Sequence, residues 1–314
     1  MLSATSIGMI MHISILVLLC VGFSFTHMIE KFPNFAHTSF ATIGIMCTYT
    51  MVRLWGFNPY LVWPVAALAN GLVGVALYLF MVRPIRRAGS GNIRLTFAMF
   101  ALTFVIRSVV SIYSYWVMRT QGFRALGFML RSYDFEFMDL PGIVFMAPLA
   151  CLAVVVSLHL FLTRTKFGIA IKATSENPQL ASILGIDINR VHVASWFITG
   201  ALAGLAGAAI PLWEYTTLGY SDKLMIDVMA GSVLGGLDSI YGAMVGGAAL
   251  AFIQTALPGI FLGPFGLGIA KYKPLIPLAV IVVILMYEPK GITSILARGS
   301  EAIKRIRDSV KGKT

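Results

Sequence analysis

The chain has 314 residues, of which 58% are hydrophobic and only 12% are charged. Soluble domains carry about 25% charged residues, so this composition excludes a soluble globular protein. The formal net charge of +11 leaves two kinds of partner open, nucleic acid and an anionic membrane surface.

Apolar runs long enough to span a bilayer fill most of the chain. In chain order the predicted spans are 7–27, 34–55, 60–82, 94–117, 142–163, 191–212, 224–238, 239–259 and 274–289. No Lys or Arg precedes the first run, so we expect a retained span there rather than a signal peptide. The sequence therefore predicts an all-α polytopic membrane protein with about eight or nine transmembrane or half-spanning helices, in one transmembrane domain over residues 1–290.

Basic residues gather in two loops and in the C-terminal tail. They are Arg83, Arg86, Arg87 and Arg94, then Arg164, Lys166, Lys172 and Arg190, then Lys304, Arg305, Arg307, Lys311 and Lys313. Because cytoplasmic loops carry an excess of Lys and Arg, this distribution is a topology signal rather than a nucleic-acid site. It predicts an N-terminus outside, an external loop from Met118 to Leu140, and a basic cytoplasmic tail over residues 291–314.

The predicted cytoplasmic loop 164–190 contains a short helix with a start and a stop signal. Asn177 suits the N-cap, Pro178 suits the first helical position, and Gly185 suits a left-handed stop. Between them Leu180, Ile183 and Leu184 form an apolar stripe at helical spacing. Such a helix either docks into another protein or lies in the headgroups as a surface helix, and the pattern alone favours neither.

Two hydrophobic segments are interrupted, and interrupted helices point to transport sites. In the first, residues 32–44, Pro33 breaks the chain, Asn34 suits a cap, and a new helix begins with the polar residues His37, Thr38 and Ser39. The second, residues 231–242, carries Gly235 and Gly236, and here the short predicted span 224–238 either crosses the membrane or is a half-helix that turns back at Asp238 and Ser239. On the predicted topology the first segment leads outward and the second inward, so we expect an inverted repeat. The alternatives are that Asn34 merely caps a helix and that the glycines merely permit close packing.

Small residues also repeat at four-residue spacing, which lets helix backbones approach closely. The pairs are Gly200 and Gly204, Ala203 and Gly207, Gly231 and Gly235, and Gly242 and Gly246. These pairs permit close packing either in a compact core within this chain or at an interface between subunits.

Arg107 lies near the middle of the predicted span 94–117. A charge at that depth costs a few kcal/mol, so it should face protein or water and have a partner. One reading is structural, an ion pair with Glu214, Asp227 or Asp238 or capture of helix-end carbonyls. The other is functional, a clamp for a substrate carboxylate.

Several catalytic signatures are missing from the sequence. It has no P-loop motif of the form G-x-x-x-x-G-K-[ST], no H-E-x-x-H and no G-x-S-x-G. The five histidines lack metal-ligand spacing, and the three cysteines all lie in apolar runs, which indicates buried thiols. An intramembrane enzyme and a passive channel remain as the alternatives to a transport subunit.

Several stretches resemble the permease subunits of ABC importers for branched-chain and other hydrophobic amino acids. They are FGIAIKATSENPQLASILGIDINRV from Phe167, ITGALAGLAGA from Ile198, VLGGLDSIYGAMVGG from Val233, NFAHTSF from Asn34 and VRPIRR from Val82. The matches run in order over nearly the whole chain, and the order is closer to the shorter of the two permeases that such systems use.

The resemblance implies an inner-membrane permease that works by ATP-driven alternating access. In this family a coupling helix of the cytoplasmic loop sits in a groove of a separate ATPase, which assigns that role to Glu176, Asn177, Pro178, Leu180, Ile183, Leu184 and Gly185. The implied partners are a second permease, two ATPases that bind the ATP, and an external binding protein; the chain itself would hold no cofactor. The implied substrates are leucine, isoleucine and valine, and related members carry urea, short amides or aromatic carboxylates.

The substrate pathway is expected beside the two interrupted segments. Its candidate residues are Asn34, His37, Thr38, Ser39, Gly235, Gly236, Ser239 and Arg107. Related permeases usually have an uncharged or acidic polar residue near the position of Arg107, so this arginine is a departure that bears on substrate choice.

Overall fold

The computed structural model describes residues 4–89, 91–265, 273–288 and 291–292. Six helices in this part of the chain are long and apolar enough to cross a membrane. These are α1 (Ala4–Glu30), α3 (Pro59–Leu77, extended through Tyr78–Val82 into α4, Arg83–Arg87), α5 (Asn92–Gln121), α6 (Ile143–Arg164), α9 (Ile188–Trp213) and α11 (Ile240–Phe265). The protein is therefore an all-α, multi-pass membrane protein, as predicted.

The other three predicted stretches form shorter helices. They are α2 (His37–Tyr49, continued by the wider turns Thr50–Leu54), α10 (Tyr220–Gly235) and α12 (Leu275–Tyr287). The basic tail predicted at 291–314 lies outside the described residues beyond Ile292.

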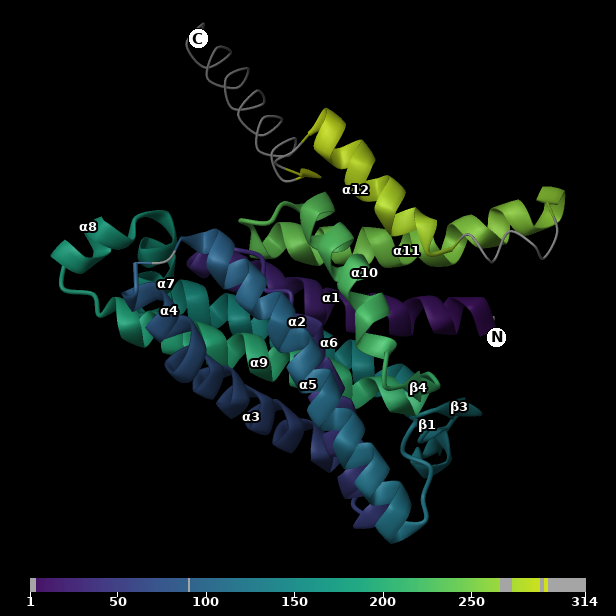
Figure 1. Ribbon diagram of the computed structural model, residues 1–314. Helices are drawn as coiled ribbons and strands as arrows, with labels where there is room; N and C mark the ends of the chain where they lie inside the picture. Colours follow the sequence, from purple (N-terminus) through teal and green to yellow (C-terminus); the bar gives the residue numbers. More distant parts are fainter. Residues whose placement is uncertain (1–3, 90, 266–272, 289–290, 293–314) are drawn as a thin grey trace, which may run out of the picture.

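The two ends of the helix bundle differ in structure (Figure 1). One end, here called the α8 end, carries α4 together with α7 (Lys166–Glu176) and α8 (Pro178–Ile183). The opposite end, here called the strand end, carries two short antiparallel pairs. In one pair β1 (Gly127–Phe128) meets β4 (Thr216–Thr217), and in the other β2 (Glu136–Phe137) meets β3 (Leu140–Pro141). The basic residues of the two predicted loops thus lie at the α8 end.

Helix α9 forms the centre of the bundle because its glycines admit neighbouring backbones. A Cβ on Gly200 would lie 2.3 Å from the Asn70 carbonyl oxygen of α3. On the α2 side, a Cβ on Gly44 would lie 2.4 Å from the Gly204 oxygen, and one on Gly207 would lie 2.1 Å from the Ala41 oxygen. Distances under 3.0 Å are not found for real Cβ atoms. The small-residue pattern therefore builds a core within this chain.

A second close contact joins α10 to α11. A Cβ on Gly235 would lie 1.8 Å from the Gly242 oxygen, and one on Gly246 would lie 2.2 Å from the Gly231 oxygen. In contrast, α5 buries only one stripe of side chains, which lies against α2 and leaves the rest of the helix surface exposed. The chain is thus tightly packed around α1, α2, α3, α9, α10 and α11, with α5 at its edge (Figure 1).

Candidate functional site

The helix predicted in the loop 164–190 is present as α8, with the expected ends. The side chain of Asn177 accepts a hydrogen bond from the backbone N–H of Leu180 at 3.0 Å, Pro178 is the first helical residue, and Gly185 has a φ of +83°. Leu180, Ile183 and Leu184 are exposed, Ile183 to 81%. Three large apolar side chains facing outward from the end of the bundle form a surface without a partner in the described chain.

The segment before α8 is also helical, which the sequence reading missed. Thr165 caps α7 by accepting the backbone N–H of Gly168 at 2.9 Å, and Ile171 is fully buried. The signal was present, because Thr165 suits an N-cap and Phe167 and Ile171 lie one turn apart. Only Asn177 separates α7 from α8, so the two helices form one angled unit.

The first interrupted segment breaks where predicted, but Asn34 is not the cap of α2. Helix α1 ends at Glu30 and α2 begins at His37, with Ala36 at the N-cap position and no side-chain cap. The Asn34 side chain instead accepts the backbone N–H of Ala36 at 3.1 Å, closing a turn before the helix. An N-cap side chain accepts from the second or third residue of the helix, and Asn34 lies two residues before the N-cap position, so it does not reach those N–H groups.

The start of α2 lies deep beside α1. The His37 ring nitrogen Nε2 lies 3.0 Å from the Leu19 carbonyl oxygen, and the ring lies against Gly22. Because α1 continues from Gly22 to Glu30, the connecting segment runs back along α1 for roughly 12 Å. Four buried polar atoms here have no hydrogen-bond partner among the described residues: Asn34 Nδ2, His37 Nδ1, Ser39 Oγ and Thr42 Oγ1. Thr38, between them, is also buried.

The second interrupted segment turns back where predicted. Helix α10 ends at Gly235, Gly236 has a φ of +109°, and the Ser239 hydroxyl accepts the backbone N–H of Gly242 at 3.1 Å at the start of α11. Lys31 at the first break lies 3.0 Å from Asp238 at the second. Both breaks are therefore at the α8 end, whereas a two-fold axis in the membrane plane would place equivalent breaks at opposite ends. The segments themselves lead in opposite directions, α2 toward the strand end and α10 toward the α8 end, and the inverted repeat stays a prediction.

Arg107 has an ion-pair partner, but not one of the three expected. Its guanidinium lies 2.5 Å from Asp222 in the first turn of α10, with side chains 48% and 40% exposed. Glu214 pairs with the Tyr220 hydroxyl, Asp227 accepts from Gln254 at 2.7 Å, and Asp238 pairs with Lys31. The sequence alone could not identify the partner of Arg107, because the partner depends on which residues at the start of α10 lie beside α5.

A buried charged cluster at the α8 end was not expected. The fully buried Glu30 carboxylate lies 2.5 Å from Arg86 of α4, and 2.7 Å and 2.9 Å from ring nitrogens of His192 and Trp196 of α9. The second ring nitrogen of His192 lies 3.0 Å from Arg86. A neutral ring satisfies this arrangement, with Nδ1 donating to Glu30 and Nε2 accepting from Arg86. The cluster joins the end of α1 to the start of α9, directly after α8.

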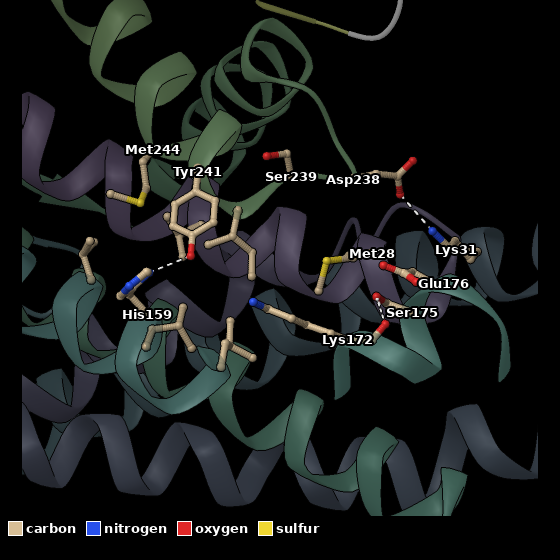
Figure 2. Close-up of a pocket in the computed structure, with 15 residues that line it drawn as sticks. Met28, Lys31, His159, Lys172, Ser175, Glu176, Asp238, Ser239, Tyr241 and Met244 are labelled. Atoms are coloured by element: carbon tan, nitrogen blue, oxygen red, sulfur yellow. Dashed lines mark hydrogen bonds and ion pairs between the residues drawn. The ribbon is translucent and has the colours of Figure 1, made fainter. Parts of the chain in front are cut away.

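A cavity of about 430 Å³ lies at the α8 end between α1, α6, α7 and α11. Its polar lining, shown in Figure 2, includes Lys31, Asp238, Lys172, Glu176, Ser239 and a His159–Tyr241 pair joined at 2.6 Å. Its apolar walls include Val21, Met28, Leu158 and Met244. The cavity contains Glu176 and Ser239 of the predicted site, whereas the buried Asn34, His37, Thr38 and Ser39 do not line it.

Comparison with known proteins assigns the chain. The family model described as the permease component of branched-chain amino acid transport systems matches residues 6–285. The chain belongs to this family. It is accordingly the permease component of a branched-chain amino acid ABC transport system, and not an enzyme; in such systems a separate subunit is the ATPase, and this chain holds no cofactor.

Individual relatives agree with the family. The permease is 33% identical to the probable branched-chain amino acid transport permease protein LivH of Methanocaldococcus jannaschii, over 92% of this chain and 91% of that protein. It is 23% identical to the high-affinity branched-chain amino acid transport permease BraD of Pseudomonas aeruginosa, over 88% and 90%. A shorter match, 32% over 36% of this chain and 31% of that protein, is to the nucleoside ABC transporter permease NupB of Lactococcus lactis. No solved structure matches the present chain.

Proposed function

We propose that the permease moves leucine, isoleucine, valine and related hydrophobic amino acids inward by alternating access. The observation that carries this proposal is α8, a capped helix that exposes Leu180, Ile183 and Leu184 at the end of the bundle. Large apolar side chains at such a site are best explained by a groove in a partner. That partner is an ATPase subunit, whose closure pushes α8 toward the membrane.

The α8 end is the cytoplasmic end on this proposal. The basic residues of the loops at α4–α5 and α6–α9 support it, because cytoplasmic loops are enriched in Lys and Arg. The N-terminus, at the strand end (Figure 1), is then outside, and the C-terminus is cytoplasmic, in the inner membrane. Residues 118–140 are external.

Motion of α8 has two routes into the bundle. One is α7, which continues from α8 and packs against α6 and α1. The other is α9, whose first turns join the Glu30 cluster. Both routes end at the α1–α2 break, where unpartnered polar atoms support a substrate path past Asn34, His37, Thr38 and Ser39. The facing turn at Gly235, Gly236 and Ser239 forms the edge of this path toward the α8 end. Burial of Asn34, His37, Thr38 and Ser39 corresponds to a closed state.

A second permease completes the transport unit, together with two ATPases and an external binding protein. The Arg107–Asp222 pair supports this, because it is half exposed on this chain near the middle of α5. Charges at membrane depth face protein or water rather than lipid. The surface of α5 and α10 around this pair is therefore covered by the second permease, in a heterodimer.

Reconstitution with the partner subunits tests the function. Uptake of labelled leucine into proteoliposomes should require ATP, both permeases and the binding protein, and unlabelled isoleucine and valine should compete. The alternative substrates are urea, short amides, aromatic carboxylates and, from the match to a nucleoside permease, nucleosides. Competition by any of these with no effect of branched-chain amino acids would reject the proposed substrates, and ATP-independent uptake would identify a channel.

A further inference from the structure

The cavity of Figure 2 has an arrangement of charges that the transport route does not use. Lys31 and Asp238 neutralise each other at 3.0 Å. Lys172 and Glu176, both on α7, have no ion pair within 4.0 Å among the described residues. The Lys172 amine points into the middle of the cavity, and the Glu176 carboxylate lies beyond it toward Asp238 and Lys31 (Figure 2). One cation and one anion are thus free to bind a ligand.

The spacing of these two groups suits an amino acid. Their Cα atoms are about one turn apart on α7, a rise of about 6 Å, and the flexible Lys172 side chain can place its amine farther from the Glu176 carboxylate than that. The amino nitrogen and carboxyl carbon of an amino acid lie about 2.5 Å apart, and a charge-assisted hydrogen bond adds about 2.8 Å at each end. The remaining walls are aliphatic or thioether side chains, among them Met28, Leu158 and Met244. A branched apolar side chain would lie against them.

The volume of the cavity favours an amino acid over a phospholipid as the ligand. At about 430 Å³ it is near the lower end of the range of about 300–1,000 Å³ for small-molecule sites. Lys31, Glu176 and Asp238 are exposed, so the cavity opens at the α8 end. It is therefore open to solutes on the side of the membrane to which, on the proposed function, the permease delivers its substrate.

We propose that this cavity binds the imported apolar amino acid on the cytoplasmic side as a product-sensing site, an inference that rests on the proposed function. Lys172 binds the carboxylate, Glu176 binds the ammonium group, and the ligand ties α7 to α1, α6 and α11. Because only Asn177 separates Glu176 from α8, a bound ligand holds α8 in one orientation. High internal product then slows ATP hydrolysis and uptake.

Direct binding is the first test, on the purified complex of both permeases and both ATPases without the binding protein. Leucine should bind saturably to the wild type, and roughly tenfold or more weakly to Lys172→Met, a loss of about 1.4 kcal/mol. Lys166→Met, on the same helix but outside the lining, is the matched control and should bind as wild type. 4-Methylpentanoate and 3-methylbutylamine, which each lack one charged group, should compete poorly. Absence of saturable binding, equal binding by Lys172→Met, or equal competition by either analogue would overturn the proposal.

Transport assays then separate this site from the proposed function. In proteoliposomes with no internal leucine, wild type and Lys172→Met should take up leucine at similar rates. With internal leucine the wild type should slow and the variant should not. Uptake in the wild type without any slowing would reject the sensing site alone, and absent uptake with intact leucine binding would reject the proposed function alone. If slowing followed the anionic lipid content of the vesicles instead of leucine, the cavity would be a lipid site and the proposal would be wrong.

Discussion

Burial decides what each ion pair of the permease contributes. The Glu30 carboxylate is fully buried with three partners, whereas the side chains of Asp187 and Arg190 are 50% and 79% exposed. Removing one member of a buried pair costs about 3–5 kcal/mol, but an exposed pair contributes about 0–1 kcal/mol. The same change of charge should therefore have very different effects at the two places.

Glu30→Gln should lower the stability of the permease, because Arg86 then stays in the cluster without its carboxylate and His192 loses its charged acceptor. We expect a loss of about 3–5 kcal/mol, seen as a lower thermal midpoint of the purified complex. Arg190→Gln, at the exposed pair, should shift the midpoint little. Equal shifts for the two variants would show that the cluster does not stabilise the α8 end.

Arg107→Gln should leave the Asp222 carboxylate alone at membrane depth, which costs about 3 kcal/mol. The yield of assembled complex should fall, and the double variant Arg107→Gln with Asp222→Asn should restore it. Arg107→Gln with Asp238→Asn is the matched control and should not, because Asp238 pairs with Lys31. A normal yield for the single variant together with lost uptake would instead identify Arg107 as a clamp for the substrate carboxylate.

At the scale of elements, the helices differ in how far they can move. Helix α8 contacts the bundle only through its neighbours, with Ala181 its one buried residue. Helices α2 and α3 lie against α9 through backbone contacts that leave no room for a Cβ. The docking helix is thus free to be displaced, while the centre of the bundle is a rigid unit.

Replacing both Leu180 and Leu184 by Asp should uncouple ATP hydrolysis from transport, because two carboxylates would enter an apolar groove unpaired. Ser182→Asp, also exposed on α8 but away from the stripe, is the control. We expect the double variant to lose substrate-stimulated ATPase activity and uptake, with the control near wild type. Wild-type stimulated ATPase activity in the double variant would exclude docking by this surface.

Gly44→Ala should force α2 away from α9, since the new methyl group would meet the Gly204 carbonyl oxygen at 2.4 Å. Overpacking of this kind costs about 1–3 kcal/mol, and a backbone oxygen cannot turn aside. Gly91→Ala is the matched control, because nothing lies within 4 Å of its Cβ position. Detergent-solubilised yield and thermal midpoint, measured for both, should fall only for the first.

The spans and the ends of α8 were predictable because they depend on neighbours in the sequence. Hydrophobic length marks each span, and Asn177, Pro178 and Gly185 mark the helix ends. Two other features were not predictable. The Arg107–Asp222 pair joins residues 115 positions apart, and the Glu30–His192 contact of the buried cluster joins residues 162 positions apart. Side chains that distant meet only through the packing of the bundle, which no local pattern contains.

At the scale of the whole molecule, charge and structure divide the permease into two ends. The basic residues of the loops at α4–α5 and α6–α9 lie at the α8 end, and the short strands lie at the other end (Figure 1). Apolar helices lie between the two ends and carry few exposed charges, among them the Arg107–Asp222 pair.

Cysteine labelling from each side of the membrane tests this division, in a background without Cys20, Cys47 and Cys151. Ala88→Cys and Gln179→Cys are both exposed at the α8 end and should react only from the cytoplasm. Gln121→Cys, exposed at the end of α5, should react only from outside. Labelling of positions 88 and 121 from one side would overturn the topology.

The dependence of α2 on α9 also has a consequence for synthesis. Helix α2 begins with polar side chains and, even with its continuation Thr50–Leu54, is not among the helices long and apolar enough to cross a membrane alone. Its contact with α9 joins residues 160 positions apart in the chain. At about 5–20 residues per second, a ribosome needs roughly 8–32 s to make that much chain. For this period the newly made α2 can contact α1, α3 and α5 but not α9, its most extensive partner, and the substrate path stays open on that side until translation reaches α9.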